Sequence, residues 1–117
     1  MSDFQRDESP DFVEPTEEEI KTFFVNLGIL IKWRRLKKKI SEETMGDAVG
    51  LNMYNVERGK ENLTLPSILN IAKYLKAKPH LMIFDAMSDQ PMHVFQEGIE
   101  KMIILNRKGK RKGENKK

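Results

Sequence analysis

Few side chains in this sequence have the types and spacing that catalysis or metal binding requires. The chain contains no cysteine, which excludes disulfides and thiolate metal sites. Its two histidines, His80 and His93, lie far apart in the sequence and have no carboxylates at the spacing of metal ligands. We expect them to be ordinary surface or half-buried histidines. The sequence also shows no glycine-rich phosphate loop and no nucleophile–base pair. We therefore predict no catalytic residue, no metal site and no cofactor, and do not expect an enzyme.

Basic side chains are the remaining candidates for chemistry, because Lys and Arg bind phosphate groups. One group of six crowds a short stretch: Lys32, Arg34, Arg35, Lys37, Lys38 and Lys39. Cations at this place also complement the carbonyl end of a helix, so the pattern fits a structural role, a phosphate-binding role or both. A second basic run at 107–117 has a net charge of +6 and indicates either a solubilising end or a nucleic-acid contact.

Charge along the chain falls into blocks. Residues 1–19 carry a net charge of −7, and residues 20–106 carry +4. Because blocks of like charge usually stay disordered, we expect an acidic disordered arm at 1–15 and a basic disordered tail at 107–117. The acidic arm either competes with DNA for the basic surface or keeps the protein in solution.

Composition predicts one soluble domain. The chain has 117 residues, 38% of them hydrophobic, which is enough for a single compact core. Its first residues lack the basic and apolar regions of a signal peptide, and its apolar runs are far shorter than the roughly 20 residues that span a bilayer. We expect a cytoplasmic protein with no membrane partner.

Helical periodicity predicts the elements that would position these side chains. Apolar residues recur at helical spacing over about 17–38, after a capping box formed by Thr16 and Glu19. A second apolar helix is predicted at about 65–76 and a shorter one at about 80–87.

The stretch 91–105 is ambiguous. Its apolar residues fit one face of a helix, but Gly98 and the run Ile103-Ile104-Leu105 leave a pair of strands as an alternative. We favour the helix. In either form it is an apolar element that follows the other helices, and a candidate dimer contact.

The central stretch, SEETMGDAVGLNMYNVERGK at 41–60, predicts two short helices joined by a turn. Ser41 suits the N-cap of the first helix, and Gly50 ends it because glycine enters a left-handed turn without steric cost. Asn52 suits the N-cap of the second helix, which ends at Gly59. Two short helices joined in this way describe a helix-turn-helix.

Residues 31–83 resemble the helix-turn-helix domain of the Cro/CI-type (XRE family) transcriptional repressors. The likeness rests on the basic end of the first helix that leads into Ile40-Ser41, on the run Val56-Glu57-Arg58-Gly59-Lys60, and on the two helices that follow Asn62. It implies an all-α fold, a five-helix Cro/CI-like helix-turn-helix bundle over residues 16–88, with an extra C-terminal element at 89–106. It also implies a repressor-like regulator of transcription that binds double-stranded DNA as a homodimer.

The resemblance gives one glutamate a structural role. In this family it pairs with an arginine near the end of the first helix, which here implies a pair between Glu57 and either Arg35 or Arg34, with Arg35 preferred. A bidentate arginine–carboxylate pair would tie the second short helix to the bundle.

The resemblance also implies a set of DNA contacts. The N-terminal residues of the second short helix reach base edges in this fold, and asparagine can bond adenine. The predicted DNA-binding residues are Asn52, Tyr54, Asn55, Arg58, Lys60, Asn62, Lys37, Lys38 and Lys39.

Two departures from the family pattern favour a second interpretation. Glu42 stands where the family usually has a glutamine that contacts DNA, and a carboxylate there would repel phosphate. The spacing from Met45 to Glu57 is shorter than the family norm by about three residues, close to one helical turn. With the acidic arm, these features favour a protein–protein interaction module that keeps the helix-turn-helix scaffold but binds DNA weakly or not at all.

Overall fold

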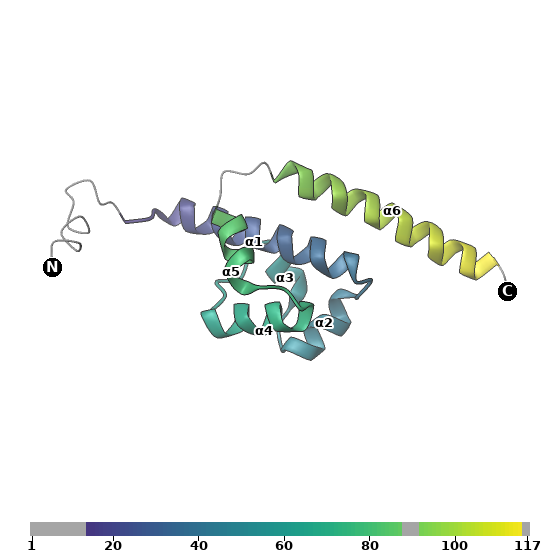
Figure 1. The fold of residues 1–117 in the computed structure, drawn as a ribbon, viewed down its shortest axis with the longest axis horizontal. Helices are drawn as coiled ribbons and strands as arrows, with labels where there is room; N and C mark the ends of the chain where they lie inside the picture. Colours follow the sequence, from purple (N-terminus) through teal and green to yellow (C-terminus); the bar gives the residue numbers. More distant parts are fainter. Residues whose placement is uncertain (1–13, 88–91, 116–117) are drawn as a thin grey trace.

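The computed structural model describes residues 14–87 and 92–115, with side chains up to Arg107 (Figure 1). Within these residues the fold is all-helical, as predicted, with no strand. The six helices are α1 (Glu17–Lys37), α2 (Glu42–Val49), α3 (Met53–Glu57), α4 (Leu65–Leu75), α5 (Pro79–Met87) and α6 (His93–Asn115). Five helices were expected, with one further element of undecided form. That element is the sixth helix, so the strand alternative is wrong for residues 92–105.

Helix α1 is the scaffold of the bundle, because α3, α4, α5 and α6 all pack against it. Its start is fixed by the expected capping box: the Thr16 hydroxyl accepts from the Glu19 N–H at 3.0 Å, and the Glu19 carboxylate accepts from the Thr16 N–H at 2.8 Å. The inner face buries Leu27, Leu30 and Ile31 in the common core. The apolar stripe of the sequence is therefore the surface on which the other helices assemble.

Helix α3 approaches α1 so closely that a side chain would not fit between them. A Cβ atom added to Gly28 would lie 2.6 Å from the carbonyl oxygens of Val56 and Glu57. Val56 itself is 2% exposed and Met53 is equally buried, so α3 is anchored by its inner face. The outer residues of α3 are thus carried on a rigid support.

The turn between α2 and α3 has the expected local chemistry. The Ser41 hydroxyl accepts from the Thr44 N–H at 3.0 Å, and Gly50 ends α2 in the left-handed region at φ +72°. The Asn52 side chain then caps α3, accepting from the Asn55 N–H at 3.2 Å. Helix α3 has only five residues, little more than one turn.

Helix α6 is part of the packed fold, lying along α1 (Figure 1). The Trp33 ring of α1 meets the Phe95 ring of α6 edge to face, with centroids 5.2 Å apart. Ile99 is buried in the same contact region, at 7% exposure. A Cβ atom on Gly98 would lie 3.1 Å from the Trp33 indole nitrogen, so the small residue leaves room for the large ring.

Helix α6 is drawn to Asn115 and so enters the stretch 107–117, for which a disordered basic tail stays a prediction. Lys and Arg are good helix formers, and cations suit the C-terminal end of a helix that is already nucleated by packing. Residues 116 and 117, like residues 1–13 of the acidic arm, lie outside the described residues. No helix in the described part of the chain is long and apolar enough to cross a membrane.

Candidate nucleic-acid interface

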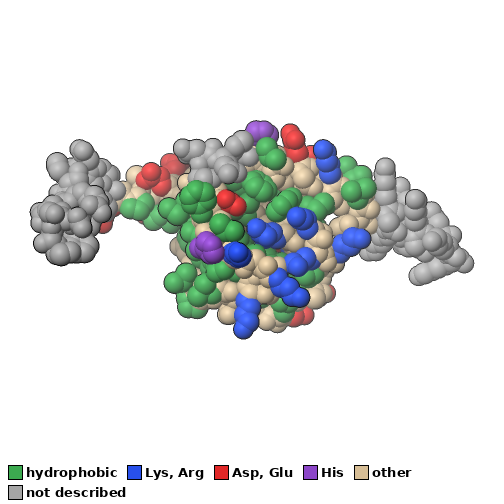
Figure 2. Space-filling model, viewed as in Figure 1, with side chains coloured by type: hydrophobic (Ala, Val, Ile, Leu, Met, Phe, Trp, Pro, Cys, Tyr) green, Lys and Arg blue, Asp and Glu red, His purple; other side chains and the backbone are tan. Residues whose placement is uncertain are grey.

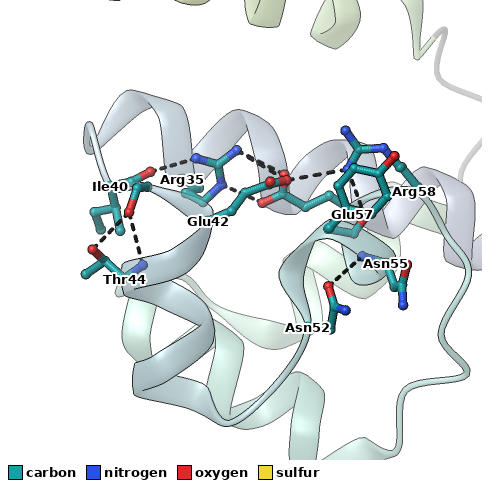
Figure 3. A network of polar contacts seen from close by, with 10 residues as sticks. Arg35, Ile40, Glu42, Thr44, Asn52, Asn55, Glu57 and Arg58 are labelled. Carbon is teal, nitrogen blue, oxygen red and sulfur yellow. Dashed lines mark hydrogen bonds and ion pairs between the residues drawn. The ribbon is translucent and has the colours of Figure 1, made fainter.

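An arginine–glutamate pair joins α1 to the end of α3 (Figure 3). The Arg35 guanidinium donates from Nε to Glu57 Oε2 at 2.5 Å and from Nη2 to Glu57 Oε1 at 3.0 Å. Its Nη1 donates to the Ile40 carbonyl at 2.7 Å, in the segment that leads into α2. The Glu57 side chain is fully buried and that of Arg35 is 7% exposed. Of the two candidate arginines, Arg35 is therefore the partner, and it fixes α1, α2 and α3 relative to one another.

Glu42 at the start of α2 extends this pair into a cluster of four charges. Its Oε2 lies 3.9 Å from Arg35 Nη2 and 3.5 Å from Arg58 Nη1. Arg58 also donates from Nη1 to the Tyr54 carbonyl at 2.9 Å, and its guanidinium carbon stacks 3.5 Å from the centroid of the Tyr54 ring. The Arg58 guanidinium is thus held between a carboxylate of α2 and an aromatic ring of α3.

The two carboxylates of the cluster have pKa values shifted in opposite directions. Burial raises the pKa of Glu57 above its usual 4.5, and the neighbouring Glu42 carboxylate adds to this against the opposing effect of Arg35. Burial also acts to raise the pKa of Glu42, but its interaction with the neighbouring Glu57 carboxyl and the charges of Arg35 and Arg58 outweigh burial, so that pKa falls below 4.5. Glu42 therefore keeps its charge at lower pH than Glu57 does.

The predicted base-reading residues surround this cluster. Tyr54 is 53% exposed, Asn52 is exposed and Asn55 is half-buried. The Asn52 amide oxygen caps α3, while the Asn55 carbonyl accepts from the Lys60 N–H at 2.9 Å and so shapes the turn after α3. The structure therefore brings Asn52, Tyr54, Asn55 and Arg58 together on the short helix.

The predicted phosphate-binding residues lie on the flanking turns. Lys38 and Lys39 are exposed in the turn after α1, and Lys60 and Asn62 are exposed between α3 and α4. Lys37 differs, because its ammonium group lies 4.3 Å from the centroid of the Trp33 ring, beside the contact with α6. Among the described residues, no hydrogen bond or ion pair joins these three lysines of 37–39 to a side chain of α3. They flank the α3 group without being tied to it.

An acidic hollow adjoins the same surface, and sequence reasoning identified only one of its carboxylates. It has a volume of about 420 Å³, lies between α2 and α3, and includes Glu42, Glu43, Asp47, Asn52 and Tyr54 in its lining. Glu43 and Asp47 are four residues apart and therefore share a face of α2, which is the signal that could have found them. The α2 side of the candidate interface is negative.

Basic side chains gather on one face of the bundle. Figure 2 shows a group of Lys and Arg side chains over the middle of the face turned to the viewer, with apolar side chains beside it. Among the residues that the structure describes, no group of three or more His, Cys, Asp or Glu side chains could hold a metal ion.

Comparison of the chain with protein-family models, with curated proteins and with solved structures finds no match. The function is therefore argued from the side chains described above. Their arrangement offers exposed amide, phenol and guanidinium groups on a short helix that packs on α1, with exposed ammonium groups in the turns after α1 and after α3.

Proposed function

We propose that this protein is a cytoplasmic, repressor-like regulator of transcription that binds double-stranded DNA through α2 and α3 as a helix-turn-helix. The observation that carries the proposal is the buried Arg35–Glu57 pair, which holds α3 against α1 and is the pair implied by the resemblance to Cro/CI-type repressors. The order of α1 to α5 supports the same bundle fold.

In this proposal two groups of side chains have different roles in binding DNA. Exposed cations contact phosphates and set the position of the protein on the duplex, while α3 offers hydrogen-bonding groups to base edges in the major groove. Asn52, Tyr54 and Asn55 are the base-reading candidates. The phosphate candidates are Arg58, Lys60, Asn62, Lys37, Lys38 and Lys39. Since phosphate contacts carry no sequence information, removing one should weaken binding to every duplex about equally.

The proposal is tested by removing single lysines. Lys38→Gln and Lys60→Gln should each weaken binding to a labelled duplex of any sequence, measured by fluorescence anisotropy. Each should also make the slope of the logarithm of the association constant against the logarithm of salt concentration less negative by about one. Lys21→Gln is the matched control, because Lys21 is an exposed lysine of α1 roughly 25 Å along the helix from Lys38. Equal losses for all three variants would show that the binding is a general effect of net charge.

A homodimer is part of the proposal. Helix-turn-helix proteins commonly bind as dimers, which place two recognition helices in successive turns of the major groove. On α6, Val94, Ile104 and Leu105 are each more than half exposed, although Phe95 of the same helix packs on Trp33 of α1. We assign this outer face of α6 to the contact with a second copy of the chain.

The alternative function is a protein–protein interaction module that keeps the helix-turn-helix scaffold. The acidic hollow between α2 and α3 favours it, because Glu42, Glu43 and Asp47 would repel DNA phosphates at the place where α2 normally approaches the backbone. A protein of this kind would bind a duplex weakly or not at all even at low salt, whereas the proposed regulator would bind it clearly.

A further inference from the structure

We propose that Glu42 is an internal competitor for DNA phosphate at Arg58, and that it sets the affinity of the interface by occupying that guanidinium. The inference rests on the proposed DNA-binding function and adds to it a residue that sets the affinity for DNA. Glu42 belongs to α2 and Arg58 follows α3, so the contact spans the two helices that would dock on DNA (Figure 3).

The geometry of Arg58 shows what a phosphate would meet. Nη1 of Arg58 faces Glu42 Oε2 at 3.5 Å and donates to the Tyr54 carbonyl at 2.9 Å, while the guanidinium plane is stacked on the Tyr54 ring. The arginine is thereby held in one orientation. Carboxylate and phosphate oxygens are equivalent acceptors for a guanidinium, so a phosphate that approaches Arg58 must displace the Glu42 carboxylate or share the arginine with it.

The charges of the cluster also indicate that Glu42 competes with phosphate for Arg58. Arg35 and Arg58 are balanced by Glu42 and Glu57, which leaves the group without net charge. Glu57 is fully buried in its bidentate pair with Arg35, whereas the Glu42 side chain is 32% exposed and makes longer contacts. Glu42 is therefore the member whose loss releases Arg58 without breaking the pair that supports α3.

The first test is Glu42→Gln, which keeps the size of the side chain and removes its charge. Binding of a labelled mixed-sequence duplex of about two helical turns is measured by anisotropy over a range of salt. Affinity should rise about two- to fivefold, the range that corresponds to a partly exposed ion pair. The slope of the logarithm of the association constant against the logarithm of salt concentration should become more negative by about one, because one more phosphate contact forms. Glu42→Ala should give the same gain and serves if the glutamine variant folds poorly by circular dichroism.

The matched control is Glu43→Gln. Glu43 is the next residue, is exposed, and makes no ion pair with either arginine in the part of the chain that the structure describes. It also lines the acidic hollow, so its removal takes away the same charge from the same surface. We expect a clearly smaller gain than for Glu42→Gln, since solvent and salt screen a charge that contacts no arginine.

A double-mutant cycle decides whether the gain acts through Arg58. In an Arg58→Gln background, Glu42→Gln should add no more affinity than Glu43→Gln does. The inference is overturned if the full gain persists without Arg58, if Glu43→Gln matches it, or if Glu42→Gln binds no better than wild type. In each of these cases wild type still binds DNA and the proposed function stands. If neither wild type nor any variant binds a duplex at low salt, the proposed function fails and the inference with it.

Discussion

Two glutamates that share one arginine cluster have different roles, because their exposure differs. Glu57 has no exposed side-chain surface and is held by Arg35 at two short distances. Glu42 keeps a third of its side chain exposed and lies 3.5 Å or more from either arginine. Loss of Glu57 would leave the Arg35 charge buried and uncompensated, whereas water can replace Glu42. Glu57 is thus a determinant of stability and Glu42 a determinant of the surface.

Replacement of Glu57 by alanine should destabilise the fold strongly. Removing one member of a buried ion pair costs about 3–5 kcal/mol of unfolding free energy, because the remaining charge loses its partner in a low-dielectric site. Urea denaturation followed by circular dichroism measures this. Glu43→Ala, an exposed change, should alter the free energy of unfolding by less than about 0.5 kcal/mol. Overlapping denaturation curves for Glu57→Ala and wild type would show that the pair does not support the bundle.

Glu42 should stabilise the fold only at pH values above the pKa that it has in the folded protein. Because that pKa lies below 4.5, the unfolded chain takes up the proton first as pH falls. The stabilisation by Glu42 is therefore present above the unfolded pKa and is lost as pH falls through the folded one. Wild type should exceed Glu42→Gln by about 0.2–1 kcal/mol at neutral pH, as for partly exposed pairs.

Denaturation of both proteins over a range of acidic and neutral pH tests this sign. The difference between them should disappear at acidic pH, once Glu42 is protonated in the folded state. Comparing the two proteins isolates Glu42 from Glu57, whose raised pKa acts in the opposite direction. A difference that stays constant down to the acid limit would contradict the pKa shift.

At the scale of helices, the caps could be predicted from the sequence and the close contacts could not. Thr16, Ser41 and Asn52 each cap a helix as expected, because the donor and acceptor lie three residues apart and the pattern is local. The crossing of α1 and α3 at Gly28 joins residues distant in the chain, and nothing in the local pattern indicates it. The contact between Glu42 and Arg58 was missed for the same reason.

Helix α6 is a second case in which a contact between residues distant in the chain cannot be predicted from the local sequence. Its amphipathic first half was predicted as a helix, but the basic run after it was predicted to be disordered from charge alone. Once Phe95 packs on Trp33 of α1, each added residue extends an existing helix and needs no new nucleus. Local charge therefore gave no signal that α6 runs on to Asn115.

Substitution of Gly98 by valine should displace α6 from α1. A Cβ atom at this position already lies 3.1 Å from the Trp33 indole nitrogen, and the valine methyl groups would extend further into the ring. Trp33 is the only tryptophan, so its fluorescence reports on this contact. The emission should shift to the red and acrylamide quenching should increase. Lys101→Ala, an exposed change on α6, should leave both unchanged, and wild-type emission in Gly98→Val would disprove the packing.

At the scale of the whole molecule, the outer face of α6 should decide the oligomeric state. Ile104→Glu and Leu105→Glu place a charge in the proposed contact and should convert a dimer to a monomer with unchanged helicity, as measured by light scattering and circular dichroism. A chain that ends at Met87 should also be a monomer. The control is Leu69→Glu on α4, where the residue is similarly exposed at 45% but distant along the fold. A monomeric wild type, or dimers that survive both α6 variants, would contradict this assignment.

The central claim is that the bundle binds DNA through its basic side chains and α3. It is tested most directly by titrating a labelled duplex with the full-length protein at several salt concentrations. The logarithm of the association constant should fall linearly with the logarithm of salt. With Arg58 occupied by Glu42, the four predicted lysine contacts (Lys37, Lys38, Lys39 and Lys60) correspond to a slope of about −3.6 for each protomer bound. No binding to any duplex at low salt, or binding that salt does not weaken, would contradict the claim.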